Sequence, residues 1–318
     1  MQKIKNISFN SKTLSAAVLV VVILISIIVF YINSSINKIN YQETQPNKEF
    51  NTDNNYIPIG NNNDEDDPLA NKNIINIILI GKDKSSEEGT RSDSIIIATI
   101  KKKDKTLKLT SLMRDLYVPI PDQMDNRINA AYSLGGMELL SRTIEENFAI
   151  EIEGCIEVDF SGFINSIDTI GGVDIELNKD EAYCLSNISG LSFTEGINNL
   201  SGKTALAYSR IRYIGNADYE RTERQRNVLV AVFNKLKDSG LKTLLGLVDD
   251  VLPFITTNFT PSQIFTIVTN VILSDISNIE SYRIPVDGEF IETNIRDMDV
   301  LLPDISENST LLKEYIEY

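Results

Sequence analysis

The stretch IINIILIGKDKSSEEGTRSDSIIIATI, residues 74–100, predicts the centre of the fold. Its apolar runs at 74–81 and 94–100 are nearly continuous and rich in β-branched residues, which is typical of strands buried inside a sheet. The run LKLTSLM at 107–113 follows the polar turn KKKDKT and predicts a third strand. Strand and helix patterns alternate along the rest of the chain. The sequence therefore predicts an α/β domain whose central mixed β-sheet is flanked by helices in αβα layers.

Further elements follow from apolar periodicity and from turn residues. We expect strands at 155–160, 171–177 and 279–286, and helices at 129–148, 161–170, 201–212, 218–240 and, as two stretches, within 241–273. The helix at 129–148 is weakened at Gly135–Gly136. Ser161 is the expected N-cap of the short helix that follows the strand at 155–160.

The N-terminal segment LSAAVLVVVILISIIVFYI, residues 14–32, predicts one transmembrane helix. It carries no charge over 19 positions, and a bilayer core requires about 20 apolar residues. A buried helix and a cleaved signal peptide are the alternatives, but the segment is longer than a usual signal core and no small-residue cleavage site follows it. Lysines precede it and acids do not, so the N-terminus should stay in the cytoplasm.

These features divide the chain into four parts. We expect a cytoplasmic tail at 1–13, the transmembrane helix at 14–32, a disordered linker at 33–72 and an extracellular domain at 73–318. The linker assignment rests on composition, because 11 of its 40 residues are asparagine and apolar periodicity is absent. The predicted location is thus the cell membrane, crossed once, with the large domain outside.

Composition excludes several classes of function. Histidine is absent, which rules out Ser-His-Asp and Cys-His catalysis as well as His-ligated zinc. Acid–base chemistry near neutral pH must then come from carboxylates or from tuned Lys, Tyr or Cys side chains. The net charge of −15 argues against nucleic acid as a partner. Cys155 and Cys184 could form a disulfide outside the cell or remain separate thiols, and the sequence leaves both open.

Arginine is concentrated in one region of the chain. Nine of the eleven arginines lie between Arg91 and Arg226, and the stretch SRIRYIGNADYERTERQR at 209–226 contains five of them. Lysine supplies much of the remaining positive charge. Guanidinium groups bind phosphate and carboxylate through paired hydrogen bonds, so this clustering predicts an anion site.

The helix predicted from Asp218 places part of this charge on its apolar face. At about 100° per residue, Asp218, Arg221 and Gln225 share one face. The same face continues as an apolar stripe: Val228, Leu229, Val232 and Leu236. An ordinary Asp–Arg pair at a solvated helix start is the alternative, although ions directed toward a core require partners or a ligand. Arg210 and Arg212 precede this helix, and both could reach one anion if their segment is extended.

Acidic residues flank the connection between the first two predicted strands. Asp83 follows one strand and Asp93 precedes the next, so antiparallel pairing would bring both carboxylates to one end of the sheet, beside Arg91 and Ser92. Paired carboxylates are ligands that Mg²⁺ and Mn²⁺ prefer. Aspartate at a strand end is also ordinary turn chemistry, which is the alternative. The nearby GKDKS does not complete the P-loop pattern.

Two further positions place arginine at the ends of predicted elements. Arg114 and Asp115 end the third strand, and Arg127 stands at a helix entrance, where the helix N-terminus also favours anions. Each of these residues taken singly is more often a solvated surface charge. Arginines and acids nevertheless converge at three strand ends and two helix starts, which predicts a common site.

The order of these motifs resembles the LytR–CpsA–Psr family, the membrane-anchored enzymes of Gram-positive cell-wall assembly. The similarity runs from about Asn76 to Arg226, and the N-terminal membrane segment agrees with the family's anchor. The matching stretches are NIILIGKD, TRSDSIIIATI, SLMRDLYVPIP, RINAAYSLGG, VDFSGFINSIDTIGGVDIEL, LSGKTALAYSRIR and DYERTERQR.

The resemblance implies a phosphotransferase that uses Mg²⁺, with Mn²⁺ as the other candidate ion. Such enzymes move a glycopolymer (a teichoic acid, or a capsule-like or secondary wall polysaccharide) from a polyprenyl-pyrophosphate carrier to a peptidoglycan hydroxyl. By resemblance, Asp83 and Asp93 bind the metal and take part in catalysis. Arg91 and Asp218 complete that set, the arginine on the pyrophosphate and the aspartate orienting arginines or metal. The positions implied to bind pyrophosphate are Arg114, Arg127, Arg210, Arg212, Arg221 and Gln225. Arg127 stands where the family often has lysine.

Two other functions would use the same residues. A lipid pyrophosphatase needs only water in place of the acceptor hydroxyl, and a non-enzymatic sensor or scaffold would bind polyprenyl pyrophosphate without turnover. A pure anion binder has no need of acids beside its arginines, which favours an enzyme. Because histidine is absent, a carboxylate, Asp83 or Asp93, is the expected base.

Overall fold

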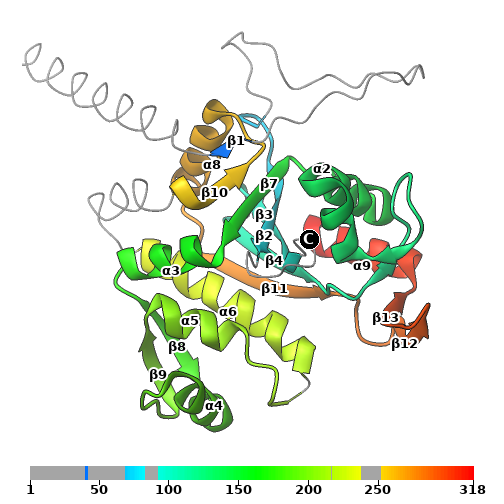
Figure 1. Cartoon of the computed structure of the whole chain (residues 1–318). Coiled ribbons are helices and arrows are strands. Elements are labelled where there is room, and N and C mark those ends of the chain that lie inside the picture. The colour runs from blue at the N-terminus through cyan, green and yellow to red at the C-terminus, as the bar shows by residue number, and fades with distance from the viewer. Residues whose placement is uncertain (1–39, 42–68, 83–91, 216, 238–251) are drawn as a thin grey trace, which may run out of the picture. The chain divides into compact units, whose positions relative to one another are not determined.

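A mixed sheet of seven strands lies at the centre of the computed structural model, which describes residues 40–41, 69–82, 92–215, 217–237 and 252–318. Its strand order is β1-β10-β7-β2-β3-β4-β11 (Figure 1). The strands are β1 (Asn40–Tyr41), β2 (Ile74–Lys82), β3 (Ser92–Lys101), β4 (Thr106–Leu112), β7 (Gly154–Asp159), β10 (Ile255–Thr257) and β11 (Asn278–Ile284). β2 and β4 are antiparallel to β3, whereas β2 is parallel to β7 and β4 to β11. The predicted mixed sheet is confirmed.

The pairing of β2 with β3 contains a bulge at the end that carries the predicted acids. Regular pairing runs from Ile74 opposite Lys101 to Gly81 opposite Ser94, and the next pair is Lys82 with Ser92. Asp93 is therefore the extra residue of a β-bulge, a feature that often re-aims the chain beside functional sites. The antiparallel pairing on which the predicted acidic constellation depends is confirmed.

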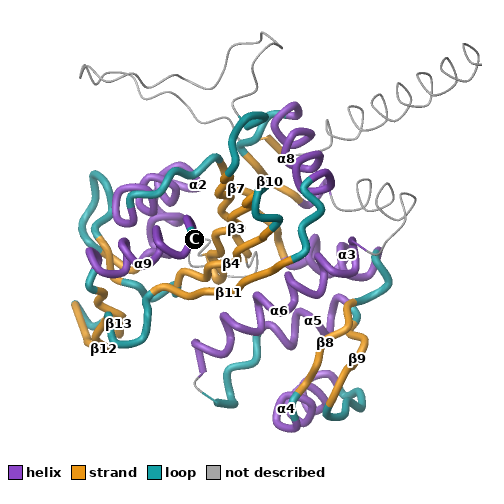
Figure 2. Tube along the Cα trace, turned by 180° about the vertical axis from the view of Figure 1, so that it is seen from behind, coloured by secondary structure: helices purple, strands orange, loops and turns teal. Residues whose placement is uncertain are grey.

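Helices cover both faces of the sheet, because successive residues of a strand point to opposite sides. On one face, Ile78 and Ile80 pack in a common core with α2 (Ile128–Phe148) and α9 (Ile305–Glu317). On the other face, Ile75 and Ile77 pack with Ile267 of α8 (Pro261–Leu273). Figure 2 shows these helices on the two sides of the strands. The predicted αβα layering is confirmed.

A further layer lies beyond α6 (Ala217–Lys237), which is itself packed against the sheet. It consists of α3 (Phe160–Thr169), α4 (Lys179–Ser189), α5 (Gly202–Ser209) and the hairpin of β8 (Val173–Leu177) and β9 (Gly196–Leu200). Val228 and Val232 of α6 belong to this outer core, whereas Leu229 packs against the sheet. The single apolar stripe predicted for α6 is therefore wrong: the helix is buried on two sides.

Two local predictions have different outcomes. The weakness expected at Gly135–Gly136 is confirmed, because both residues leave helical geometry inside α2 and Gly136 has a φ of 65°. The predicted Ser161 cap of α3 is wrong. Asp159 is the N-cap and accepts a hydrogen bond of 2.8 Å from the backbone N–H of Gly162, since β7 runs directly into the helix.

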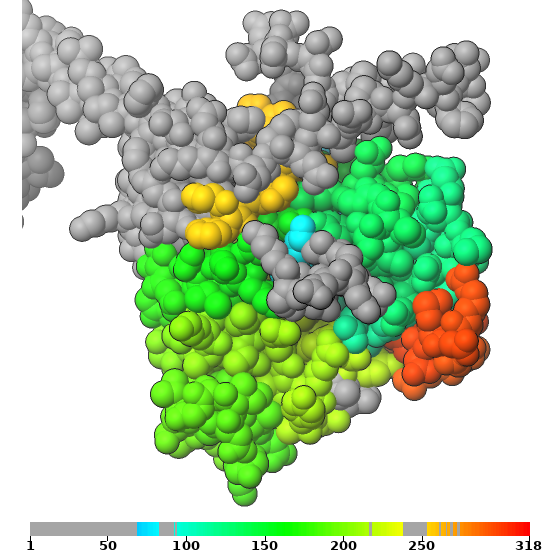
Figure 3. All heavy atoms as spheres, viewed as in Figure 1, coloured from blue at the N-terminus to red at the C-terminus, as the bar shows by residue number. Residues whose placement is uncertain are grey.

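Several short elements complete the described structure. The C-terminal hairpin of β12 (Phe290–Ile295) and β13 (Met298–Pro303) forms the orange-red surface in Figure 3. The remaining pieces are β5 (Tyr117–Val118), β6 (Asn126–Arg127) and the 3₁₀ turn η1 (Leu252–Phe254). Within the range predicted as a linker, β1 pairs with β10.

The structure bears on the cysteine pairing but not on the predicted membrane segment. Among the helices in the described ranges, none has both the length and the apolar character that a membrane crossing requires. The predicted span at 14–32 lies outside those ranges. Cys155 and Cys184 are both free, and they belong to different cores, on β7 and α4 respectively. The two thiols are therefore not joined.

Candidate functional site

Asp218, in the first turn of α6, is the centre of a cluster of arginines. Its Oδ1 lies 2.8 Å from Nη1 of Arg221 and 3.6 Å from Nε of Arg212, and its Oδ2 lies 3.8 Å from Nη2 of Arg114. These guanidinium groups come from α6, from the α5–α6 loop and from the segment after β4. One carboxylate thus joins Arg212 and Arg221 of the 209–226 stretch to the distant Arg114. The predicted helix face of Asp218 and Arg221 therefore lies beside the end of β4.

Asp115 extends this cluster to a fourth arginine. Its Oδ1 accepts a hydrogen bond of 3.0 Å from Nη1 of Arg127, and its Oδ2 lies 3.3 Å from Nε of Arg114. Arg127 ends β6 and directly precedes α2. Four guanidinium groups and two carboxylates give the cluster a net charge of +2, four minus two. The surplus positive charge suits a multivalent anion.

Gln225 connects α6 to the beginning of β3. Its Oε1 accepts a hydrogen bond of 3.0 Å from Oγ of Ser94, the residue that follows the bulged Asp93. Gln225 stands one turn after Arg221 on the same helix face. The arginine cluster and the strand ends that carry the predicted acids are therefore neighbours.

Arg210 contacts a different part of the sheet edge. Its guanidinium lies over the ring of Phe160, 4.7 Å from the ring centroid. Phe160 follows Asp159, whose partner in the sheet is Lys82 at the end of β2. Arg210 thus stands at the edge where β2 and β7 end, two residues before Arg212 of the arginine cluster.

The residues predicted to bind the metal lie only partly within the described structure. Asp83 and Arg91 lie outside the described residues, and the backbone alone is described for Asp93. In the described part of the chain, no three acidic or cysteine side chains converge as a metal site. The donor chemistry nevertheless fits a hard cation. Lys82 and Ser92, which directly precede Asp83 and Asp93 in the sequence, are paired at one end of the sheet, and carboxylate oxygens suit Mg²⁺.

Two arginines of the 209–226 stretch serve the fold. Arg226, 7% exposed, donates from Nη1 to Oγ of Ser111 at 2.7 Å on the sheet side of α6. Arg224, 2% exposed, pairs with Glu181 and Glu220 on the other side. The density of arginine in this stretch therefore overstates the number of groups available to an anion.

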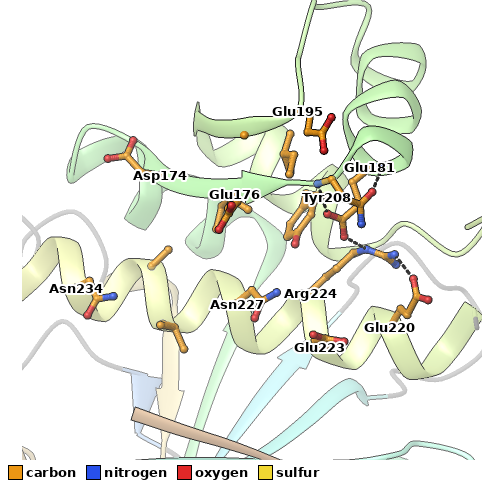
Figure 4. A pocket seen from close by; sticks show the side chains of 16 residues that line it. Asp174, Glu176, Glu181, Glu195, Tyr208, Glu220, Glu223, Arg224, Asn227 and Asn234 are labelled. Carbon is orange, nitrogen blue, oxygen red and sulfur yellow. Dashed lines mark hydrogen bonds and ion pairs between the residues drawn. The ribbon is translucent and has the colours of Figure 1, made fainter. Parts of the chain in front are cut away.

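A cavity of about 750 Å³ lies between α6 and the β8–β9 hairpin (Figure 4). Its acidic lining residues are Asp174, Glu176, Glu181, Glu195, Glu220 and Glu223. The α6 residues that line it, among them Glu220, Arg224 and Asn227, recur every three or four positions on the side of the helix away from Asp218. Because its α6 residues lie on the side of the helix opposite Asp218, this cavity is separate from the arginine cluster, and its acidic lining suits an anion poorly.

Asp115 belongs to the arginine cluster, although the predicted set of ligands did not include it. The available signal was its position next to Arg114 at a strand end, but spacing alone does not show which acid pairs with which arginine. The same holds for Ser94, which contacts Gln225, and for Phe160 beneath Arg210. Contacts between segments distant in the sequence decide these roles.

Fold and side chains together define an α/β protein with a cluster of arginines and aspartates near the end of its central strands. Comparison with known proteins gives the family. The chain belongs to the LytR_cpsA_psr family, which matches residues 26–314. The predicted resemblance is confirmed.

Relatives of established name share most of the chain. Regulatory protein MsrR of Staphylococcus aureus (strain COL) is 30% identical over 254 residues, 79% of this chain and 76% of the relative. Polyisoprenyl-teichoic acid–peptidoglycan teichoic acid transferase TagU of Bacillus mycoides (strain KBAB4) is 32% identical over 223 residues, 69% of this chain and 71% of the relative.

Solved structures share the fold. A structure of TagT bound to LIIa-WTA matches with a TM-score of 0.67 at 22% identity, over 80% of this chain and 93% of that one. A structure of TagT with bound octaprenyl pyrophosphate lipid matches with a TM-score of 0.62 at 21% identity, over 80% of this chain and 95% of that one. Their helices and strands thus follow the same architecture.

Proposed function

We propose that this chain transfers a cell-wall glycopolymer from a polyprenyl-pyrophosphate carrier to a hydroxyl group of peptidoglycan. The observation that carries the proposal is the gathering of Arg114, Arg212 and Arg221 around Asp218. Membership in the family, the transferase name of TagU and the lipid bound to TagT support it. A teichoic acid is the first candidate for the polymer, and other wall polysaccharides are the second.

The arginine cluster would bind the pyrophosphate. Guanidinium groups pair with phosphate oxygens through two parallel hydrogen bonds, and they stay charged at every relevant pH. Asp218 and Asp115 hold the arginines close together against their mutual repulsion before the anion arrives. Arg127 and Arg210 would approach from the two sides of the cluster, and Gln225 would fix the α6 face above β3.

Asp83 and Asp93 would hold Mg²⁺ or Mn²⁺, which supplies neutralisation of the charge on the phosphate oxygens. Whichever of the two carboxylates keeps a free oxygen would take the proton of the acceptor hydroxyl. The acceptor oxygen forms a bond to the phosphorus attached to the glycan, and the bond from that phosphorus to the bridging oxygen breaks. Polyprenyl phosphate leaves, and Arg91 and the cluster stabilise its negative charge. The product is a phosphodiester between glycan and peptidoglycan.

The proposed location follows from the substrates. Carrier lipid and peptidoglycan meet at the outer face of the cell membrane, and the apolar segment at 14–32 would anchor the chain there with its N-terminus in the cytoplasm. Partners are thus the lipid-linked glycopolymer, peptidoglycan and the membrane.

The decisive experiment uses the full chain in detergent. It receives a short-chain polyprenyl-pyrophosphate saccharide, peptidoglycan oligomers and Mg²⁺, and the products are analysed by mass spectrometry. We expect a glycan–phosphodiester–peptidoglycan conjugate from the wild type, and none from Asp93→Ala or Arg221→Ala. Arg142→Ala is the matched control, because Arg142 pairs with Asp122 and Glu146 on the surface of α2.

The same assay separates the two other functions. Release of polyprenyl phosphate without a conjugate would indicate a lipid pyrophosphatase. Tight binding of the lipid with no turnover on any acceptor would indicate a sensor or scaffold. Either result in the wild type would contradict the proposed transfer.

A further inference from the structure

We propose that Arg224 is a positioning residue, which holds the α5–α6 loop so that Arg210 and Arg212 meet the pyrophosphate. The inference rests on the proposed function. Nη1 of Arg224 donates a hydrogen bond of 3.1 Å to the backbone carbonyl of Ile211, the residue between the two loop arginines. Arg224 thus acts through the segment that carries two of the proposed ligands. Its own guanidinium forms hydrogen bonds with other groups of the protein.

The guanidinium of Arg224 has defined partners on each of its edges. Nε donates to Oε1 of Glu181 at 2.8 Å, and Nη2 donates to Oε2 of Glu220 at 2.6 Å (Figure 4). Its side chain is 2% exposed. Because the guanidinium is planar and rigid, the two carboxylates fix the direction in which Nη1 points. The position of the Ile211 carbonyl is therefore set by α4 and α6.

Glu181 is itself held in place. Its Oε2 accepts a hydrogen bond of 3.1 Å from the backbone N–H of Asn178, and its own N–H donates to Oδ1 of Asn178 at 2.9 Å. These two bonds form the capping box at the start of α4. Oε1 remains directed at Arg224, so the anchor on the α4 side is part of a rigid helix start.

The loop arginines on either side of Ile211 depend on this anchor. Ile211 is 1% exposed within the outer core, whereas Arg212 is 43% exposed in its side chain and reaches Asp218 at 3.6 Å. Arg210 lies over Phe160. Without the bond to its carbonyl, Ile211 would leave a buried acceptor unsatisfied, and the loop would adopt alternative arrangements. Both arginines would then spend less time at the site.

A lysine at this position provides the sharpest test. Arg224→Lys keeps the positive charge between Glu181 and Glu220, but an ammonium cannot hold the Ile211 carbonyl and both carboxylates in the same planar arrangement. Arg226→Lys is the matched control, since Arg226 is a buried arginine of the same helix that bonds Ser111 on the sheet side. If Arg224→Lys does not fold, Glu220→Gln replaces it as the test variant. It weakens the contact between Nη2 of Arg224 and position 220 but retains an acceptor oxygen there.

The first readout is affinity for farnesyl pyrophosphate with Mg²⁺, measured by calorimetry on the full chain in detergent. We expect Arg224→Lys to weaken binding about tenfold in the wild type, and to cause no further loss when it is added to a variant that already carries both Arg210→Ala and Arg212→Ala. Non-additivity is expected because Arg224 acts through the loop. Additive losses, or a lower melting temperature with unchanged affinity, would overturn the inference.

The second readout requires no ligand. Amide hydrogen exchange at residues 210–215 should be about tenfold faster in Arg224→Lys than in the wild type, and unchanged in Arg226→Lys. Equal exchange in wild type and Arg224→Lys would contradict the positioning role. If the wild type does not bind polyprenyl pyrophosphate at all, the proposed function fails, whereas the exchange experiment still decides whether Arg224 orders the loop.

Discussion

Asp218 Oδ1 lies 2.8 Å from Arg221 Nη1, and this ion pair forms the inner part of a site that Arg212 and Arg114 complete from outside, at 3.6 and 3.8 Å. Arg221 is 4% exposed in its side chain, whereas Arg212 is 43% exposed. The carboxylate keeps positive groups close together that would otherwise repel one another. The site therefore owes its shape to an acid as much as to its arginines.

Replacing Asp218 by asparagine should weaken anion binding, although it makes the site more positive. A neutral amide is a poorer partner than a carboxylate for three guanidinium groups, so these would move apart; we expect about a tenfold loss of affinity for farnesyl pyrophosphate. Calorimetric titration measures it. Tighter binding in Asp218→Asn would show that net charge outweighs orientation. Asp122→Asn is the control, because Asp122 is 79% exposed in a surface pair with Arg142.

Gly202→Ala should destabilise the outer layer. A Cβ at Gly202 would lie 2.2 Å from the backbone oxygen of Ile164, where α5 crosses α3. The helices must separate, which costs about 1–3 kcal/mol, and the melting temperature reports it. Lys203→Ala, at the next and exposed position, should change stability by less than about 0.5 kcal/mol. Equal melting temperatures for the two variants would contradict the close approach.

Lys108→Met should loosen the C-terminal helix. Nζ of Lys108 donates to the carbonyl oxygen of Tyr315 at 2.5 Å and lies 3.3 Å from Glu280 Oε2, with its side chain 4% exposed. Methionine fills the space but leaves a carbonyl in the last turn of α9 without this donor, a loss of about 1.5–3 kcal/mol. Denaturant unfolding measures the change. Lys103→Met, at an exposed position, is the comparison. A similar loss of stability there would contradict the role of the bond between Lys108 and Tyr315.

Glu145→Gln should stabilise the protein at neutral pH. Burial raises the pKa of Glu145 above its ordinary value of 4.5, so its ionisation costs more in the folded state than in the unfolded chain. The wild type therefore loses stability as pH rises from the unfolded pKa through that raised pKa, and the loss is complete above it. Glutamine keeps an acceptor for the N–H of Ile152, which bonds Glu145 Oε1 at 3.0 Å.

Scanning calorimetry at about pH 7 and about pH 4 tests this expectation. The melting temperature of Glu145→Gln should exceed that of the wild type at the higher pH, and the difference should shrink at the lower one. A difference that does not change with pH would show that packing, not ionisation, distinguishes the two side chains.

The central strands were predictable because each is a nearly continuous run of apolar residues, which indicates a strand that is buried on both faces. Isoleucine-rich runs at 74–81 and 94–100 became β2 and β3, and the arginine face of α6 followed from helical spacing. These patterns need no knowledge of distant segments. The antiparallel pairing of β2 with β3, on which the prediction of neighbouring acids depends, is present in the structure.

Other elements depend on partners that the sequence does not reveal. The strand β9 has the polar sequence GINNL, and only Leu200 of it is buried, through contacts with the outer core. Two buried lysines, Lys101 of β3 and Lys108 of β4, donate hydrogen bonds to carbonyl oxygens of α9. In the sequence alone, these lysines look like ordinary surface charges. Arg221 and Arg224 share one motif, but they serve different sides of α6 because that helix is buried twice.

The double burial of α6 has a consequence for the entropy of binding. Arg226 fastens the helix to β4 through Ser111, and Arg224 fastens it to α4 through Glu181, so α6 can neither rotate nor slide easily. Arg221 and Gln225 have thus lost their conformational freedom when the protein folds. If the site binds pyrophosphate as proposed, the ordering cost should fall mainly on the exposed side chain of Arg212, and very little of it on the helix.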